Sequence, residues 1–107
     1  MNDNNIKNNI LTYEIYNEID HHSAKKIREE IDNKIYSTKP KTLILDMTNT
    51  NFMDSSGLGL ILGRLRLMNE INGELKILNP SNRIYKIIQM AGIEKLVKIE
   101  RNKTNEK

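Results

Sequence analysis

The sequence contains no cysteine and no tryptophan, and only one phenylalanine and two prolines among its 107 residues. Without cysteine, the chain cannot form a disulfide framework or a thiolate metal site. No apolar run approaches the roughly 20 residues of a membrane-spanning helix. The first ten residues, MNDNNIKNNI, lack the basic and apolar regions of a signal peptide. These absences predict a cytoplasmic protein with no membrane partner.

Positive charge is slight and dispersed. The formal net charge is +3, and the basic residues at 25–28 are followed by acidic residues within 29–32. Arg64 and Arg66 have no aromatic neighbours on which bases could stack. A nucleic-acid footprint would be clustered on one face, so no nucleic-acid partner is expected. A chain of this length holds one domain, with no room for a separate catalytic domain.

Strand and helix patterns alternate along the chain. The predicted strands are residues 10–16, 42–47, 75–78 and 97–99, and the predicted helices are residues 24–37, 55–72 and 80–91. The order β-α-β-α-β-α-β predicts an α/β fold with a small, mostly parallel sheet flanked by helices. The pattern leaves open whether the helices cover one face of the sheet or both.

Several details of this pattern make local predictions. The continuous apolar run 42–47 indicates a strand buried on both faces, and residues 48–54 are expected to be a loop. Gly73 is predicted to be the left-handed residue after the second helix. Asn79 and Pro80 resemble a cap followed by the first helical residue. The core stripe of the second helix is predicted to be Leu58, Ile61, Leu62, Leu65 and Met68.

The segment FMDSSGLG, residues 52–59, lies where a loop enters the second predicted helix. The first amides of a helix have no internal partner, and the helix dipole is positive there, so a phosphate on Ser56 would be tolerated. Gly57 and Gly59 keep the surroundings small enough for another protein to reach the hydroxyl, and Asp54 places a carboxylate beside it. The alternative is an ordinary N-cap with glycines that allow close packing.

Catalytic interpretations of this segment fit poorly. Met53 and Leu58 stand where a nucleophile elbow centred on one or the other serine would need glycine. His21 and His22 belong to a distant loop, so they give no triad, and a histidine pair without a spaced third ligand is weak evidence for a metal. The glycines at 57 and 59 do not continue into a dinucleotide fingerprint. No enzymatic activity, cofactor or metal is therefore expected.

Two motifs resemble one known family. Residues 17–24 (NEIDHHSA) are similar to the Gly-Glu-Leu-Asp-x-x-x-Ala entry into the first helix of the STAS domain. Residues 52–59 resemble the phosphorylation motif of that family, and the match continues through residues 60–64 (LILGR). Asn17 replaces the usual glycine, which asparagine can do because it tolerates a positive φ. The resemblance implies a single STAS domain over residues 1–107. Residues 1–9 are polar and are expected to be frayed or a short edge strand, and the charged residues 101–107 are expected to be frayed.

The histidine pair and the Leu-Gly-Arg ending resemble the sporulation branch of the family, the anti-sigma factor antagonists. The resemblance implies that the unmodified protein binds an anti-sigma factor, which is also a serine kinase, and so frees a sporulation sigma factor. The kinase would use ATP to phosphorylate the second serine, Ser56, and a serine phosphatase would reverse this.

Five further residues are predicted to form the switch loop and partner surface: Asp20, Asp54, Ser55, Gly57 and Arg64. Asp20 is expected to lie near Asp54, because the carboxyl ends of parallel strands share one edge of a sheet, and either to contact the partner or to cap the first helix. Ser55 would cap the second helix and position Ser56. Arg64 would reach an acidic partner or simply be an exposed arginine.

Three other functions stay open. The same module could serve a general stress sigma factor, Ser56 could be the nucleophile of a small enzyme, or the chain could be a scaffold that stacks STAS domains. Adjacent genes for an anti-sigma kinase and a sporulation sigma factor would distinguish the first, a serine-directed acylating probe the second, and large stable assemblies the third.

Overall fold

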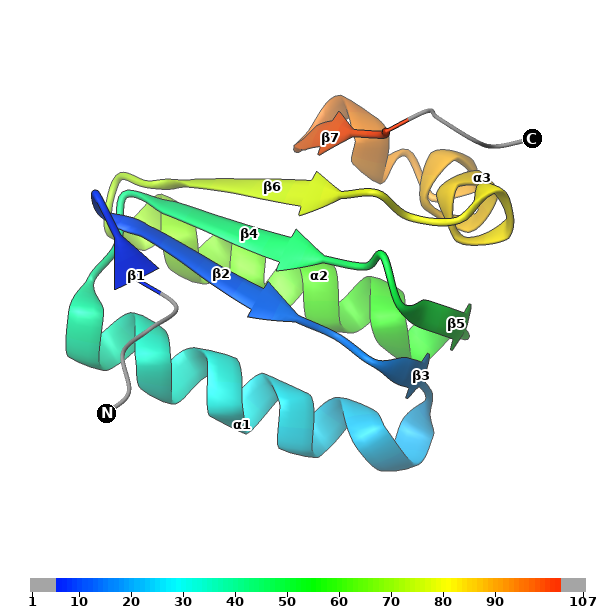
Figure 1. The fold of residues 1–107 in the computed structure, drawn as a ribbon, viewed down its shortest axis with the longest axis horizontal. Coiled ribbons are helices and arrows are strands. Elements are labelled where there is room, and N and C mark those ends of the chain that lie inside the picture. Colours follow the sequence, from blue (N-terminus) through cyan, green and yellow to red (C-terminus); the bar gives the residue numbers. More distant parts are fainter. Residues whose placement is uncertain (1–5, 103–107) are drawn as a thin grey trace.

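The computed structural model describes residues 6–102 (Figure 1). Its elements follow the chain as β1 (Ile6–Lys7), β2 (Ile10–Glu14), β3 (Asn17–Ile19), α1 (His21–Thr38), β4 (Thr42–Asp46), β5 (Thr50–Met53), α2 (Ser55–Glu70), β6 (Glu74–Leu78), α3 (Asn82–Met90), a 3₁₀ turn (Ile93–Lys95) and β7 (Lys98–Glu100). The terminal residues 1–5 and 103–107, which were expected to be frayed, lie outside the described range. Of residues 1–9, Ile6–Lys7 form a short edge strand.

The main sheet has five strands in the order β1-β2-β4-β6-β7. Only β1 is antiparallel to its neighbour, and the pairs β2–β4, β4–β6 and β6–β7 are all parallel. The predicted α/β fold with a small, mixed and mostly parallel sheet is therefore confirmed. A second, two-stranded parallel sheet joins β3 to β5.

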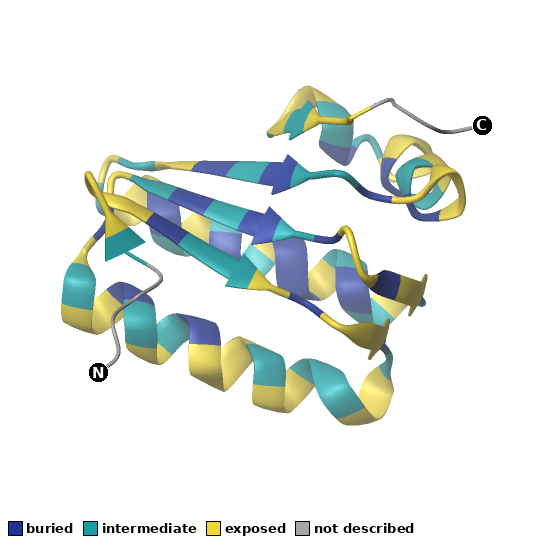
Figure 2. Cartoon of the chain, in the orientation of Figure 1, coloured by how far each residue is buried: buried dark blue, intermediate teal, exposed yellow. Residues whose placement is uncertain are grey.

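The helices cover one face of the main sheet. Each crossover moves in the same direction across the sheet, and right-handed crossovers then place their helices on the same side. Figure 1 shows α2 behind the strands and α1 below them in the view, and the two helices are in contact. The prediction that residues 42–47 are buried on both faces was therefore wrong. Leu43 and Leu45 are fully buried against the helices, whereas Ile44 on the other face is only half-buried (Figure 2).

The core stripe of α2 is rotated from the prediction. Gly57, Leu60, Ile61, Arg64 and Met68 are buried, whereas Leu62 is 43% exposed. This helix packs against both α1 and β6, so its buried face is centred between two neighbours and includes positions that a single apolar stripe does not show.

Three boundary predictions were also wrong. Asn72 (φ 62°), and not Gly73, is the left-handed residue after α2. A Cβ on Gly73 would lie 2.8 Å from the Lys41 carbonyl oxygen, so this glycine allows a close backbone approach instead. Ser81 caps α3 by accepting from the Ile84 amide, because Asn79 is itself left-handed. The expected loop 48–54 contains β5.

Candidate switch site

The starts of α1 and α2 lie side by side because the short strands before them are paired. Ile19 of β3 is in register with Met53 of β5, and the Asp54 amide donates to the Ile19 carbonyl oxygen at 3.1 Å. Asp20 and Asp54, the next residues after these strands, are therefore neighbours. The expectation that the two acidic residues share one edge is confirmed.

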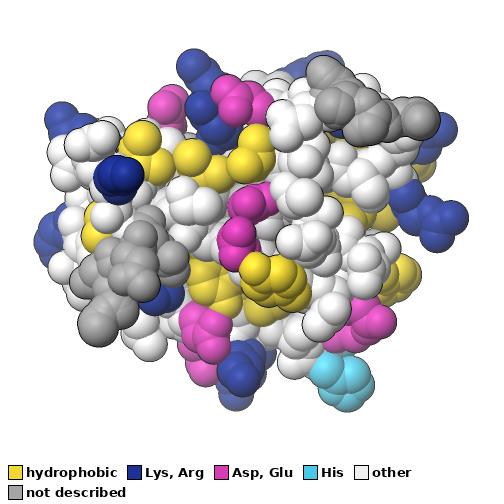
Figure 3. Space-filling view, viewed as in Figure 1, with side chains coloured by type: hydrophobic (Ala, Val, Ile, Leu, Met, Phe, Trp, Pro, Cys, Tyr) yellow, Lys and Arg dark blue, Asp and Glu magenta, His cyan; other side chains and the backbone are white. Residues whose placement is uncertain are grey.

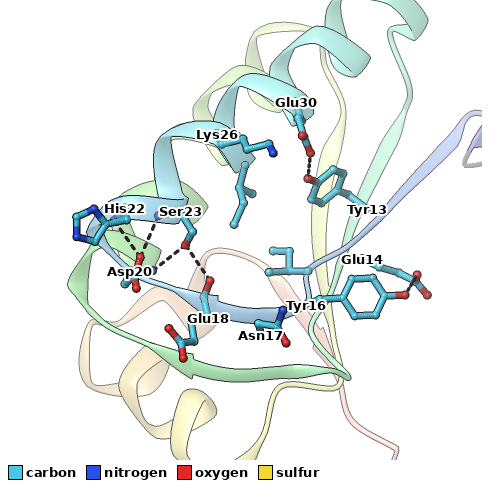
Figure 4. Close-up of a pocket in the computed structure, with 12 residues that line it drawn as sticks. Tyr13, Glu14, Tyr16, Asn17, Glu18, Asp20, His22, Ser23, Lys26 and Glu30 are labelled. Carbon is cyan, nitrogen blue, oxygen red and sulfur yellow. Dashed lines mark hydrogen bonds between the residues drawn. The ribbon is translucent and has the colours of Figure 1, made fainter.

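Asp20 caps α1 through a closed set of hydrogen bonds (Figure 4). Its Oδ1 accepts from the amides of His22 and Ser23, both at 2.9 Å, and the Asp20 amide donates back to Ser23 Oγ at 3.0 Å. The hydrogen bond from the Ser23 amide is the main reason why the pKa of Asp20 is lowered. Asn17 has φ 68°, the left-handed conformation that asparagine was expected to tolerate at this position.

Asp54, rather than Ser55, caps α2. Its Oδ1 accepts from the Ser56 amide at 2.8 Å, which satisfies one of the donors at the helix start. Ser55 is the first residue of the helix and is exposed, whereas Ser56 is half-buried. Within residues 6–102 no hydrogen bond engages either hydroxyl. The cap therefore does not use the Ser56 hydroxyl.

Packing explains only one of the three glycines that follow Ser56 in α2. A Cβ on Gly57 would lie 2.2 Å from Met53 Cγ and 3.3 Å from Ile19 Cγ2, so packing against β3 and β5 requires this glycine. A Cβ on Gly59 or Gly63 would have nothing within 4 Å. Glycine inside a helix costs about 0.5–1 kcal/mol relative to alanine, and the fold gives no reason for these two.

A basic groove of about 460 Å³ runs between α1 and α2 beside Ser56. From α2 it is lined by Ser56, Gly59, Leu60, Gly63 and Arg64, and from α1 by His21, Ala24, Lys25 and Arg28. Ser56, Gly59 and Gly63 are spaced by three and four residues, so they form one small-residue strip along α2. No aspartate or glutamate belongs to the lining.

Arg64 differs from its predicted setting. Its side chain is only 8% exposed, and its Nε lies 2.8 Å from Asp32 Oδ1 of α1. Its Nη1 also donates to the Leu60 carbonyl oxygen at 3.3 Å. Burial is the main reason why the pKa of Arg64 is lowered. The residue joins the two helices at the floor of the groove and is not an exposed arginine.

The sequence interpretation missed four residues around the site. Lys25, Arg28 and Gly63 line the groove, and Phe52 of β5 is 44% exposed close to the capping aspartate. The three- and four-residue spacing from Ser56 could have indicated Gly63. Nothing in the sequence placed the α1 cations opposite Ser56, because the pairing of β3 with β5 was not predicted.

Two other surface regions are less distinctive than this groove. A hollow of about 510 Å³ between β2 and α1 mixes acidic, basic and aromatic side chains, among which the Tyr13 hydroxyl donates to Glu30 (Figure 4). The helix-free face of the sheet shows hydrophobic and acidic side chains side by side (Figure 3). The described residues contain no group of three or more potential metal ligands. None of their helices is both long and apolar enough to cross a membrane.

The chain belongs to the STAS domain family, whose model matches residues 3–105. Among curated relatives, an anti-sigma F factor antagonist from Paenibacillus polymyxa is 33% identical over 96 residues, which cover 90% of this chain and 82% of the relative. An anti-sigma-B factor antagonist from Listeria monocytogenes is 27% identical over 84 residues, which cover 78% and 72%.

Two solved structures are also similar to this chain. The anti-sigma factor antagonist SpoIIAA in its unphosphorylated form is 33% identical, with a TM-score of 0.75, over 84% of this chain and 78% of that one. The Bacillus cell fate determinant SpoIIAA in its phosphorylated form is 32% identical, with a TM-score of 0.70, over 88% and 85%. The family suggested by the two sequence motifs is thus confirmed.

Proposed function

We propose that this protein is an anti-sigma factor antagonist whose binding is switched off by phosphorylation of Ser56. The observation that carries the proposal is the Ser56 hydroxyl, which is free of hydrogen bonds among residues 6–102 and opens on a groove at the start of α2. The similarity to SpoIIAA, which was solved in both an unphosphorylated and a phosphorylated form, supports it.

The chemistry is a phosphoryl transfer from ATP that a partner kinase holds. Ser56 Oγ attacks the γ-phosphorus, a new O–P bond forms, and the bond to the oxygen that bridges the β- and γ-phosphates breaks. ADP leaves with that bridging oxygen, and the hydroxyl proton passes to a base or to water. The anti-sigma factor is the proposed kinase, and a serine phosphatase hydrolyses the ester to restore the hydroxyl.

The switch acts by charge. A phosphate adds about −1.5 to −2 charges at neutral pH, beside the carboxylates of Asp54 and Asp20. A partner surface that fits a neutral hydroxyl would then face an unmatched charge in a desolvated contact. Because Asp54 holds the amide of Ser56, the helix start does not need the hydroxyl, and the fold can stay as it is.

The partner surface is proposed to include the small-residue strip and the exposed edge of β5. Gly59 and Gly63 give a partner a flat approach along α2, and Phe52 offers an exposed aromatic side chain close to the serine. Aromatic side chains are common among the residues that dominate binding energy. This surface belongs to a regulator that works in the cytoplasm, without nucleic acid or membrane as its partner.

The test mixes the protein with its cognate anti-sigma factor and labelled ATP. We expect label on Ser56 by peptide mass spectrometry, and none on a Ser56→Ala variant that still binds. Ser56→Asp should bind at least about tenfold more weakly, because it places a charge in the contact. Ser55→Ala is the matched control and should be labelled and released like the wild type.

Equal, tight binding by Ser56→Asp and Ser56→Ala would contradict the switch, and label on Ser55 alone would move it by one residue. A general stress pathway is the second candidate, because of the anti-sigma-B relative. Affinity measured against anti-sigma factors of both types decides between the pathways, and we expect the F type to bind more tightly, in line with the higher identity to the F-type relative.

A further inference from the structure

The groove beside Ser56 carries positive charge that is not neutralised. Lys25 and Arg28 line it from α1 and are exposed, and in the described part of the chain neither has a carboxylate within ion-pair distance. Arg64, by contrast, is paired with Asp32. Two cations of α1 thus face α2 without a partner.

The helix geometry directs these cations toward the serine. The helices α1 and α2 begin side by side at His21 and Ser55, and both follow parallel strands, so they run in the same direction. Along the axis, Lys25 lies roughly 4–5 Å beyond the level of Ser56, and Arg28 about one turn further. Side chains on a helix lean back toward its N-terminus, which brings both cationic groups toward Ser56.

We propose that this groove is the binding site for the phosphate on Ser56, with Lys25 and Arg28 as its ion-pair partners within the same chain. Charge-assisted hydrogen bonds from ammonium and guanidinium groups are the usual way in which proteins hold a phosphate. This inference rests on the proposed function only in taking Ser56 as the modified residue.

A phosphate held in this groove would also change the surface that a partner contacts. A phosphate on Ser56 that is held by Lys25 and Arg28 lies at the N-terminal end of the small-residue strip, beside Gly59, whereas Gly63 is about 10 Å further along α2. Modification then adds charge and also fills the start of the groove that a partner would use. The two cations, which an acidic partner segment could otherwise contact, are occupied at the same time.

The experiment measures the pKa of the phosphate group itself. Phosphoserine is installed at position 56 during translation, and the phosphate is titrated by ³¹P nuclear magnetic resonance. The charged and titratable groups facing it are His21, Lys25 and Arg28 from α1, Arg64 from α2, and the two capping carboxylates at the helix starts. The cations favour the dianion, whereas the carboxylates oppose it.

In the Lys25→Gln/Arg28→Gln double variant we expect the pKa of the phosphate to rise by about half a unit relative to the unsubstituted chain, the size expected from two exposed ion pairs. Lys26→Gln is the matched control. It removes one positive charge from the same helix, where the double variant removes two, but Lys26 lines the other hollow, so the titration should not move.

An unchanged titration in the double variant would overturn the proposal, as would a shift of half that size or more in Lys26→Gln, which would show a general charge effect. Thermal unfolding of the unphosphorylated variants checks that the fold is kept, because all three side chains are exposed. The phosphate is installed without a kinase, so failure of the anti-sigma factor to label Ser56 is a separate result that bears on the proposed function alone.

Discussion

At the scale of single residues, most left-handed backbone positions of this chain are occupied by asparagine. Among residues 6–102, the non-glycine residues with positive φ are Asn8, Asn9, Asn17, Lys39, Asn72 and Asn79. Asparagine tolerates this conformation better than most residues. The glycines of α2 have ordinary helical backbones, and only Gly57 is required by packing. Near Ser56, Gly57 is thus needed for its small size and not for its backbone conformation.

This contrast gives a prediction for three alanine variants. Gly57→Ala should lower the free energy of unfolding by about 1–3 kcal/mol, because its Cβ would meet the Met53 side chain. Gly59→Ala and Gly63→Ala should each raise it by about 0.5–1 kcal/mol, since both Cβ atoms have open space. Denaturant unfolding measures all three.

The affinity for the anti-sigma factor should change in the opposite direction to the free energy of unfolding. If the small-residue strip contacts the anti-sigma factor, Gly63→Ala gives a more stable protein that binds more weakly. A Gly63→Ala protein that gains stability and keeps full affinity would remove the strip from the partner surface.

At the scale of elements, the start of α1 depends on one carboxylate. The pKa of Asp20 is lowered, chiefly by the Ser23 amide, so the folded state favours the ionised form. Its contribution to stability is therefore complete above the ordinary pKa of about 4 and is lost as the pH falls through the lowered value.

Asp20→Asn separates charge from capping, because asparagine also caps helices but does not titrate. We expect the melting temperature of the wild type to exceed that of Asp20→Asn at pH 7, and the difference to shrink as the pH is lowered to about 3. Glu29→Gln, exposed on the same helix, serves as the control. A difference that stays constant over this range would contradict the assignment.

The pair of α1 with α2 is joined by Arg64 and Asp32. Arg64→Ala should destabilise the protein by about 1–3 kcal/mol, because it removes buried packing and leaves Asp32 without its cation. Adding Asp32→Ala to that variant should cost less than Asp32→Ala costs in the wild type. Fully additive losses in this double-mutant cycle would show that the two charges do not interact.

The sequence predicted elements well where periodicity was strong, and poorly where tertiary pairing decided. The strands β3 and β5 were missed because each has three or four residues, and Asn17, Glu18 and Phe52 are exposed, so no alternation was visible. The burial of Arg64 was missed because only the contact between α1 and α2 supplies its partner, Asp32, 32 residues away. The motif placed Ser56 correctly at a helix start, since capping is local.

At the scale of the whole molecule, the switch lies at one edge of the fold. The carboxyl ends of β3 and β5 lead directly into α1 and α2, and the core residues Leu43, Leu45 and Ile77 lie on the main sheet. The Ser56 side chain is only half-buried, and its hydroxyl has no hydrogen-bond partner among residues 6–102, so its modification breaks no hydrogen bond within that part of the fold.

We therefore expect phosphorylation of Ser56 to change amide resonances at the starts of α1 and α2 and to leave those of β4 and β6 nearly unchanged. Two-dimensional nuclear magnetic resonance spectra of the modified and unmodified chains measure this directly. The Ser56→Ala spectrum gives the effect of losing the hydroxyl alone. Shifts spread across the central strands would show that the modification remodels the core.

Asp54, and not the serine, satisfies the amide at the start of α2. Because the hydroxyl does not hold the helix, it can be esterified and hydrolysed repeatedly without loss of the hydrogen bond that caps α2. In the proposed switch, the ratio of kinase turnover to phosphatase turnover would set the phosphorylated fraction, and one molecule could pass through many cycles.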